Sequence, residues 1–122
     1  MKIGLVGLGR MGGAMSQRLR EQGFEVVGWD ANADRNKALG NSGLRIAANP
    51  RAIAAESEII ISIITEDHGV RRIFRGPEGF LRGDVAGKLF IEMSTLQPMT
   101  GRALAPFVES MGGRLIESPV LG

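Results

Sequence analysis

The residues of this sequence best suited to chemistry are glycines near its start. Gly7, Gly9 and Gly12 have the spacing G-x-G-x-x-G, directly after an apolar run and at the start of an amphipathic one. At such a strand-to-helix turn the first glycine allows a sharp bend, the second lets a phosphate approach the backbone, and the third lets the helix pack closely on the sheet. The spacing therefore predicts a site for the pyrophosphate group of a dinucleotide.

The start of the helix after these glycines adds a second reason to expect anion binding. The amides of Arg10 and Met11 lack acceptors within a helix, and the helix dipole adds partial positive charge there. The alternative is a glycine-rich turn that binds no ligand. The expected cofactor contacts in this turn are Gly7, Leu8, Gly9, Arg10, Met11 and Gly12.

An acidic residue stands at the distance from the glycines that a nucleotide ribose requires. Asp30 ends an apolar run about 20 residues after Gly9. Its carboxylate can accept hydrogen bonds from both hydroxyls of the adenosine ribose and would repel a 2′-phosphate. Ala31 follows where an NADP site would often place Arg, although Arg35 on the next helix could still reach a phosphate. We therefore expect NAD as the preferred cofactor, with Asp30 and Ala31 in contact with it, and NADP as the alternative.

The composition excludes several other kinds of site. The 122 residues include no Cys and one His, His68, which excludes a disulfide scaffold, a thiolate nucleophile and a two-His metal site. We expect no metal, and His68 is better explained as a solvated side chain than as a proton relay. A net charge of +2 gives little reason to expect nucleic acid. The longest strongly apolar run, 59–64, is too short for a membrane span, so we expect a cytoplasmic protein without a membrane partner.

The elements that must position these residues follow from the hydrophobic pattern. Short apolar runs predict strands, and amphipathic runs, several of them closed by Gly, predict helices. The predicted strands are 2–7, 24–30, 44–48, 58–64, 89–93 and 114–118. The predicted helices are 10–22, 33–39, 49–57, 66–74 and 98–111, and 75–87 is predicted as a loop. This alternation predicts one α/β domain over residues 1–122, with a Rossmann-type doubly wound, mainly parallel six-stranded sheet.

Three segments, in order along the chain, carry a family resemblance. Residues 7–15 (GLGRMGGAM) match the pattern Gly-Leu-Gly-x-Met-Gly-x-x-Met, and residues 93–98 (MSTLQP) contain Ser-Thr-x-x-Pro. Residues 117–122 (ESPVLG) are similar to the start of Ala-Pro-Val-Ser-Gly-Gly. Together they resemble the β-hydroxyacid dehydrogenases, a family that includes 3-hydroxyisobutyrate dehydrogenase, tartronate semialdehyde reductase and 6-phosphogluconate dehydrogenase.

The resemblance implies the cofactor domain of an NAD(P)-dependent 3-hydroxyacid dehydrogenase. Such an enzyme transfers a hydride between a nicotinamide and the alcohol carbon of a small 3-hydroxy acid, which becomes an aldehyde or keto acid. By this match Thr95 lies near the nicotinamide ribose and the substrate, Ser94 lies beside the substrate, and Gly122 offers backbone to the substrate carboxylate. Ser94 and Thr95 could instead simply cap the helix that begins at Pro98. We also place Ile64, at the end of its strand, among the cofactor contacts.

The sequence departs from the family pattern in ways that bear on activity. Leu121 stands where the family often has Ser, and Thr65 where many relatives have Pro. The family's general acid/base is a lysine in a helical segment beyond the cofactor domain. The three lysines of this chain, Lys2, Lys37 and Lys88, are predicted within the cofactor domain and away from the cofactor site. We therefore expect no catalytic residue in this chain, which would lack the C-terminal helical catalytic and dimerisation domain. We expect it to be inactive alone and to form a homo-oligomer.

Other functions stay open at this point. A stand-alone nucleotide-sensing domain would share the glycine turn but is not expected to contain Ser-Thr-x-x-Pro. The cofactor domain of an imine-reductase-like enzyme would share the opening motif and use another proton donor, and a non-catalytic scaffold would bind no dinucleotide. Among the remaining side chains, we expect Met11, Met15 and Trp29 in the core, with an adenine contact as the alternative for Trp29. The arginines of segment 71–75 are expected on an exposed helix face.

Overall fold

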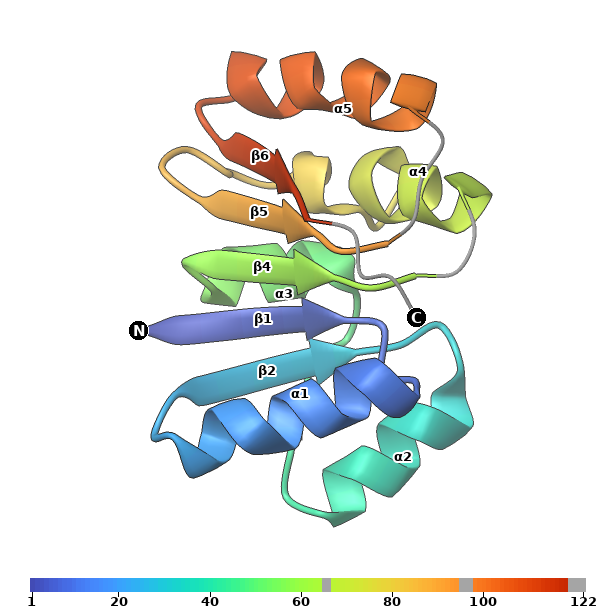
Figure 1. Cartoon of the computed structure of the whole chain (residues 1–122), viewed down its shortest axis with the longest axis vertical. Helices are drawn as coiled ribbons and strands as arrows, with labels where there is room; N and C mark the ends of the chain where they lie inside the picture. Colours follow the sequence, from blue (N-terminus) through green and yellow to red (C-terminus); the bar gives the residue numbers. More distant parts are fainter. Residues whose placement is uncertain (65–66, 95–97, 119–122) are drawn as a thin grey trace.

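The computed structural model describes the backbone of residues 1–64, 67–94 and 98–118, and their side chains except at 67–68 and 98–102. Within this part, the chain forms one six-stranded sheet with helices between the strands (Figure 1). The strands are β1 (Lys2–Val6), β2 (Glu25–Trp29), β3 (Arg45–Ile46), β4 (Ile59–Ser62), β5 (Leu89–Glu92) and β6 (Arg114–Glu117). The helices are α1 (Arg10–Glu21), α2 (Ala33–Asn41), α3 (Pro50–Glu56), α4 (Asp67–Arg75), the short 3-10 helix η1 (Phe80–Arg82) and α5 (Pro98–Ser110).

The strands lie in the order β3-β2-β1-β4-β5-β6, and every neighbouring pair is parallel. The prediction of a doubly wound parallel α/β sheet is therefore confirmed. The order reverses between β1 and β4, whose last residues, Val6 and Ser62, are partners in the register. Open parallel sheets bind ligands at their carboxyl edge, at such a reversal point. The fold thus places the glycine turn, which follows β1, at the edge where a ligand is expected.

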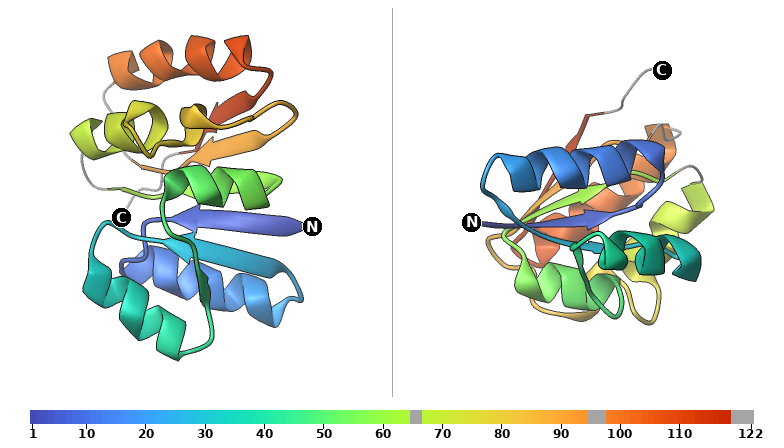
Figure 2. Two further views of the ribbon diagram at one scale, coloured as in Figure 1. Left: turned by 180° about the vertical axis from the view of Figure 1, so that it is seen from behind. Right: turned by 90° about the horizontal axis from the view of Figure 1, so that it is seen from below.

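Helices cover both faces of the sheet because successive strand residues point to opposite faces. On β1, Leu5 belongs to a core cluster with Met15 of α1 and Leu39 of α2. Its neighbour Val6 belongs to the other cluster, which draws on α3, α4, η1 and α5. The sheet lies between these two layers (Figure 2). Both faces of β1 are therefore dry, which explains its almost wholly apolar sequence.

Side-chain caps fix the starts of two helices. The Asn32 side chain accepts hydrogen bonds from the amides of Asp34 and Arg35, at 2.9 and 3.3 Å, and so begins α2. The Asn49 side chain accepts one from Ala52 N at 2.8 Å, with Pro50 as the first residue of α3. These caps satisfy amides that have no acceptor within their own helix. The predicted helix starts are therefore close to the observed ones.

The prediction of a plain loop at 75–87 was wrong, because this segment contains η1. Phe80 at its start is completely buried, and its ring centroid lies 4.9 Å from that of Phe74 and 5.1 Å from that of Phe90. Burial of an aromatic side chain is a strong driving force, so Phe80 anchors the segment to the core. The segment is rich in glycine, which is typical of a loop and gives no indication that Phe80 is buried. The strand predicted at 44–48 is also shorter than expected, with only Arg45–Ile46 in the sheet.

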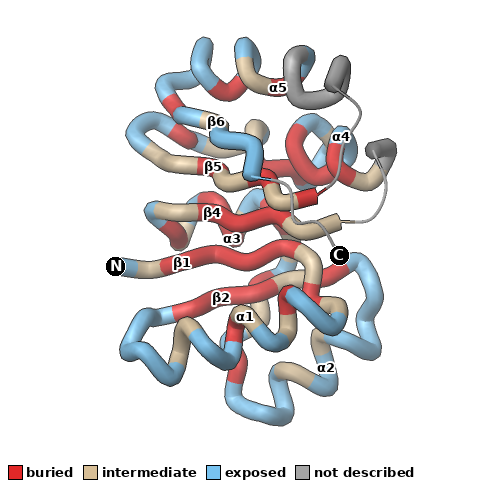
Figure 3. The backbone as a smooth tube through the Cα atoms, in the orientation of Figure 1, coloured by how far each residue is buried: buried red, intermediate tan, exposed pale blue. Residues whose placement is uncertain are grey.

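Burial is concentrated in the middle of the sheet (Figure 3). β1 and β4 are buried along most of their length, whereas three of the four residues of edge strand β6 are exposed. Ile116 of β6 is 43% exposed, although it is a large apolar residue. Among the described residues, no helix is long and apolar enough to span a membrane, and no group of three or more His, Asp or Glu could hold a metal ion.

Candidate functional site

The glycine turn after β1 has the geometry that its sequence predicts. Gly7 has a φ of 101°, a conformation that side chains disfavour, and a Cβ there would overlap the carbonyl oxygen of Ile63. A Cβ on Gly12 would overlap the carbonyl oxygen of Gly7. Helix α1 begins immediately after Gly9, and its first amides carry no side-chain cap. The start of α1 thus offers backbone donors to an anion, in a turn that requires glycine at positions 7 and 12.

Asp30 is joined directly to this turn. It is 7% exposed, and its Oδ2 accepts a hydrogen bond of 2.6 Å from Leu8 N. Its Oδ1 accepts one of 2.7 Å from Asn32 N. The side chain of Asn36 bonds both the amide and the carbonyl of Asp30, at 2.9 and 2.8 Å. The structure thus brings the acid at the end of β2 and the glycine turn into one rigid unit.

Arg35 of α2 lies over the same place. One guanidinium nitrogen is 3.5 Å from Asp30 Oδ2, and a Cβ built on Gly9 would lie 3.6 Å from that nitrogen. The Arg35 side chain is 54% exposed, so it can turn toward a ligand. A cation here offsets the repulsion that the carboxylate exerts on a phosphate. The site therefore holds one group that disfavours a 2′-phosphate and one that favours it.

A cavity of about 490 Å³ opens beyond the ends of β2 and β4. Ala31 and Ile64, both predicted cofactor contacts, lie in its wall, and so do Trp29 and Arg72. Trp29 also packs against the core cluster of Val6, which confirms the prediction that it belongs to the core. The cavity thus brings together two residues that the sequence predicts to contact the cofactor.

Ser94 and Ile64 meet at the carboxyl edge, just beyond the ends of β5 and β4. Ile64 N donates a hydrogen bond of 2.5 Å to Ser94 Oγ, and Ser94 is 5% exposed. The structure thus brings together one predicted cofactor contact and one predicted substrate contact. Thr95 and Gly122, the other two residues predicted at this end, lie outside the described residues, as do Thr65 and Leu121.

A buried acid that was not predicted as a site residue lies at the end of β5. Glu92 is 1% exposed, and its Oε1 accepts a hydrogen bond of 3.0 Å from Ser94 N. Burial raises the pKa of Glu92 and the charge of Glu117 adds to this effect, whereas the hydrogen bonds from Ser94 oppose it. The signal was present in the sequence, because Glu92 is the one charged residue within the apolar run 89–93.

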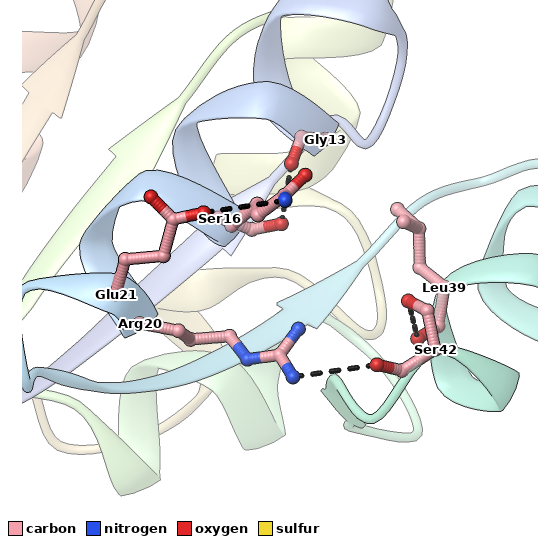
Figure 4. Close-up of a pocket in the computed structure, with 7 residues that line it drawn as sticks. Gly13, Ser16, Arg20, Glu21, Leu39 and Ser42 are labelled. Carbon is pink, nitrogen blue, oxygen red and sulfur yellow. Dashed lines mark hydrogen bonds between the residues drawn. The ribbon is translucent and has the colours of Figure 1, made fainter.

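A second surface cavity, of about 440 Å³, lies between α1 and α2 (Figure 4). Its polar groups are engaged within its own wall. Ser16 Oγ donates to Gly13 O at 2.7 Å, and Arg20 donates to Ser42 O at 3.4 Å. None of the predicted contacts lines it, so we do not count it as part of the candidate site.

Other predicted side chains are confirmed or corrected by their burial. Met11 is 43% exposed, so its assignment to the core was wrong, because it stands at the start of α1 beyond the edge of the sheet. Met15, one turn later, packs on the core as expected. The arginines of 71–75 are exposed as predicted, and Arg75 lies 4.0 Å from the ring centre of Phe107. The His68 side chain lies outside the described side chains.

The chain matches one protein family over nearly its whole length. The family model described as the NAD binding domain of 6-phosphogluconate dehydrogenase matches residues 2–122. The cytokine-like nuclear factor N-PAC of Danio rerio is 33% identical over 121 residues, and the mitochondrial 3-hydroxyisobutyrate dehydrogenase of Mus musculus is 30% identical over 120 residues. These alignments cover 99% and 98% of this chain but 26% and 36% of the relatives. The chain therefore spans about a quarter to a third of the length of these curated relatives.

Solved structures show the same partial match. The 3-hydroxyisobutyrate dehydrogenase of Mycobacterium tuberculosis, solved with L-serine, has a TM-score of 0.89 at 27% identity, over 99% of this chain and 40% of that one. A reductive aminase of Aspergillus terreus, solved with NADPH and ethyl levulinate, has a TM-score of 0.84 at 26% identity, over 99% of this chain and 41% of that one. The first structure agrees with the resemblance of the sequence to the β-hydroxyacid dehydrogenases. The second shows that the chain is about equally similar to a reductive aminase.

Proposed function

Because the chain belongs to the family of the NAD binding domain of 6-phosphogluconate dehydrogenase, we propose that it is the cofactor domain of an oxidoreductase acting on a small 3-hydroxy acid. The observation that carries the proposal is the hydrogen bond from Leu8 N to Asp30 Oδ2. It joins a turn suited to pyrophosphate with an acid suited to the adenosine ribose. These two groups are adjacent in a dinucleotide, so one ligand can engage both.

Titration with NADH, followed through the fluorescence of the cofactor, tests the proposal. We expect saturable binding, and we expect Asp30→Asn to weaken it roughly tenfold because a charge-assisted acceptor for the ribose is lost. Asp34→Asn is the matched control, since Asp34 is exposed in the first turn of α2 and its charge lies outside the turn. No binding of NADH by the unaltered chain would overturn the proposal.

The preference for NAD over NADP is part of this proposal. It is supported by the buried carboxylate of Asp30 and by the small Ala31 that follows it. Arg35 acts in the opposite direction, so NADP is expected to bind more weakly rather than to be excluded. Parallel titrations with NADH and NADPH measure the difference. Tenfold tighter binding of NADPH would contradict the role given to Asp30.

The 3-hydroxy acid substrate is supported by the motif at 93–98 and by the likeness to 3-hydroxyisobutyrate dehydrogenases. The likeness to a reductive aminase supports a second candidate, an imine-reductase-like enzyme. A ternary binding experiment separates the two. A 3-hydroxy acid that changes the fluorescence of bound NADH supports the first, whereas a change seen only with a ketone and an amine supports the second.

We propose further that the chain alone does not turn over its substrate. Lys2 begins β1 at the opposite edge of the sheet, Lys37 is exposed on α2, and Lys88 donates to backbone carbonyls at the end of α3. None of these lysines is placed to exchange a proton with a substrate at the carboxyl edge. Oxidation of 3-hydroxyisobutyrate by the purified chain would contradict this.

We propose finally that the chain associates with itself and that the protein is cytoplasmic. Exposed Ile116 on an edge strand supports association, because unpaired strand edges and apolar patches favour contacts between chains. Sedimentation at several concentrations tests it, and we expect Ile116→Lys to shift the chain toward the monomer. Subcellular fractionation of the native protein tests the location.

A further inference from the structure

A buried carboxyl group lies where the sheet meets the end of the site predicted to hold the nicotinamide. Glu92 is the last residue of β5, and its register partners are Ser62 on β4 and Glu117 on β6. Glu92 and Ser62 are 1% and 2% exposed. This carboxyl group is thus at the carboxyl edge of the sheet but beneath its surface, too deep to touch a ligand directly.

Two hydrogen bonds connect Glu92 to both segments that leave this edge. Ser94 N donates to Glu92 Oε1 at 3.0 Å, which fixes the turn after β5. Ile64 N donates to Ser94 Oγ at 2.5 Å, which ties that turn to the segment after β4. Ser94 is therefore held from two sides, by a carboxyl group below it and an amide beside it.

Burying the carboxyl group of Glu92 costs more free energy than a residue with only a packing role would need to cost. Glu92 Oε2 and Ser62 Oγ are both buried, and neither makes a hydrogen bond of good geometry with a described residue, although the Ser62 hydroxyl lowers the pKa of Glu92. Buried polar atoms without partners destabilise a fold, and an apolar side chain of similar size would avoid the cost. A carboxyl group kept here at such a cost suggests a role in the site above it.

We propose that Glu92 is a positioning residue that holds the segments after β4 and β5 together and so sets the place of the nicotinamide half of the cofactor. It acts through Ser94 and Ile64 and not by contact with the cofactor. The adenine half, bound by the glycine turn and Asp30, is independent of it. This inference rests on the proposed function, since it assumes that a dinucleotide binds at this edge.

Comparison of two ligands tests this role. NADH needs both halves of the site, whereas ADP-ribose keeps the second ribose but lacks the nicotinamide ring, so its binding depends mainly on the adenine half. We expect Glu92→Leu, which removes the acceptor for Ser94 N, to weaken NADH roughly tenfold and to leave ADP-ribose within about twofold. Ser94→Ala removes the bond to Ile64 N and should show the same pattern to a smaller degree. Because Ser94→Ala is a small change at a turn, it keeps the test available if the Leu variant does not fold.

Two further variants separate positioning from general stability. Glu92→Gln keeps an oxygen that can accept from Ser94 N, so it should restore NADH binding to near the unaltered level. Ser57→Ala alters another buried serine whose Oγ lacks a partner among the described residues, after α3, and should leave both affinities unchanged. An equal loss of NADH and ADP-ribose, or no loss in either Glu92→Leu or Ser94→Ala, would overturn the inference. Failure of the unaltered chain to bind either ligand would instead count against the proposed function.

Discussion

Asp30 does two things at once at the scale of a single residue. Its two carboxylate oxygens hold the glycine turn and the start of α2, through Leu8 N and Asn32 N. Oδ1 can accept a second hydrogen bond, and Oδ2, which also accepts one of 3.5 Å from Arg35, can accept another when Arg35 turns away, so the same group can still receive the ribose hydroxyls of a cofactor. The acid is therefore both part of the scaffold and part of the predicted binding surface, and a substitution there affects both.

Glu92 should make stability depend on pH in an unusual direction. Burial raises the pKa of Glu92 above its ordinary value of 4.5, so the folded chain binds this proton more tightly than the unfolded chain. The stability that the protonated group contributes is fully present below pH 4.5 and is lost as the pH rises through the raised pKa. Glu92→Gln is neutral at every pH, so relative to the unaltered chain it should gain stability as the pH rises.

Urea unfolding of both proteins at pH 5 and pH 8 measures this difference. Glu109, which is exposed on α5, provides the control variant Glu109→Gln. We expect that control to show little pH-dependent difference. A Glu92→Gln variant that loses as much stability at pH 8 as at pH 5 would show that the buried carboxyl does not carry the effect.

Sequence alone predicted the residues whose chemistry depends on local spacing. The glycine turn and Asp30 follow a pattern in which every position has a local reason, so their places could be predicted. Glu92 could not be assigned in this way, because its burial comes from β4, β6 and the covering helices, which are distant in sequence. Met11 was misassigned for the same reason, since helical spacing does not show where a helix passes the edge of its sheet.

At the scale of elements, the turn into α1 gives a sharp contrast between neighbouring glycines. A Cβ on Gly12 would overlap Gly7 O, whereas one on Gly13 would meet only ordinary contacts at 3.7 Å or more. We expect Gly12→Ala to cost about 2–3 kcal/mol of stability and to abolish NADH binding. Gly13→Ala should instead gain about 0.5–1 kcal/mol, because alanine favours a helix over glycine. Chemical denaturation of the two variants measures both, and similar losses would contradict the geometry.

The cap of α3 offers a second test at this scale. Asn49 accepts a hydrogen bond from Ala52 N, and Asn49→Ala should cost about 1 kcal/mol. Asn41→Ala, an exposed residue at the end of α2, is the matched control and should change little. Thermal unfolding of both variants gives the comparison, and equal midpoints would indicate that the cap contributes nothing.

Helices and strands could be predicted where the residue types and the spacing of the apolar residues indicated the same kind of element. β1 and β4 are apolar along their length, and the starts of α2 and α3 carry polar caps, so their predicted bounds are close to the observed ones. η1 was missed because glycines surround it, and what fixes it is the burial of Phe80 between Phe74 and Phe90. Such long-range packing leaves no periodic signal in the sequence.

At the scale of the whole molecule, a bound cofactor should stabilise the fold. If NADH binds the folded chain and not the unfolded chain, a free NADH concentration of about 100 times its Kd adds about 2.7 kcal/mol to the free energy of unfolding. Urea unfolding with and without NADH measures this, and free nicotinamide at the same concentration is the control. An unfolding midpoint that does not move with NADH would contradict binding to the folded state.

The central place of β1 also governs how the chain must assemble. β1 pairs on one side with β2, the next strand along the chain, and on the other side with β4. In the second pair, Ile59, the first residue of β4, lies opposite Ile3. Closing a chain segment of more than about 50 residues costs entropy before the contacts form, so this pairing is slow relative to a local hairpin or helix. During synthesis, one side of β1 stays unpaired until the residues of β4 have been made. We therefore expect the pairing of β1 with β4, which completes the carboxyl edge beside the glycine turn, to be among the slower steps of folding.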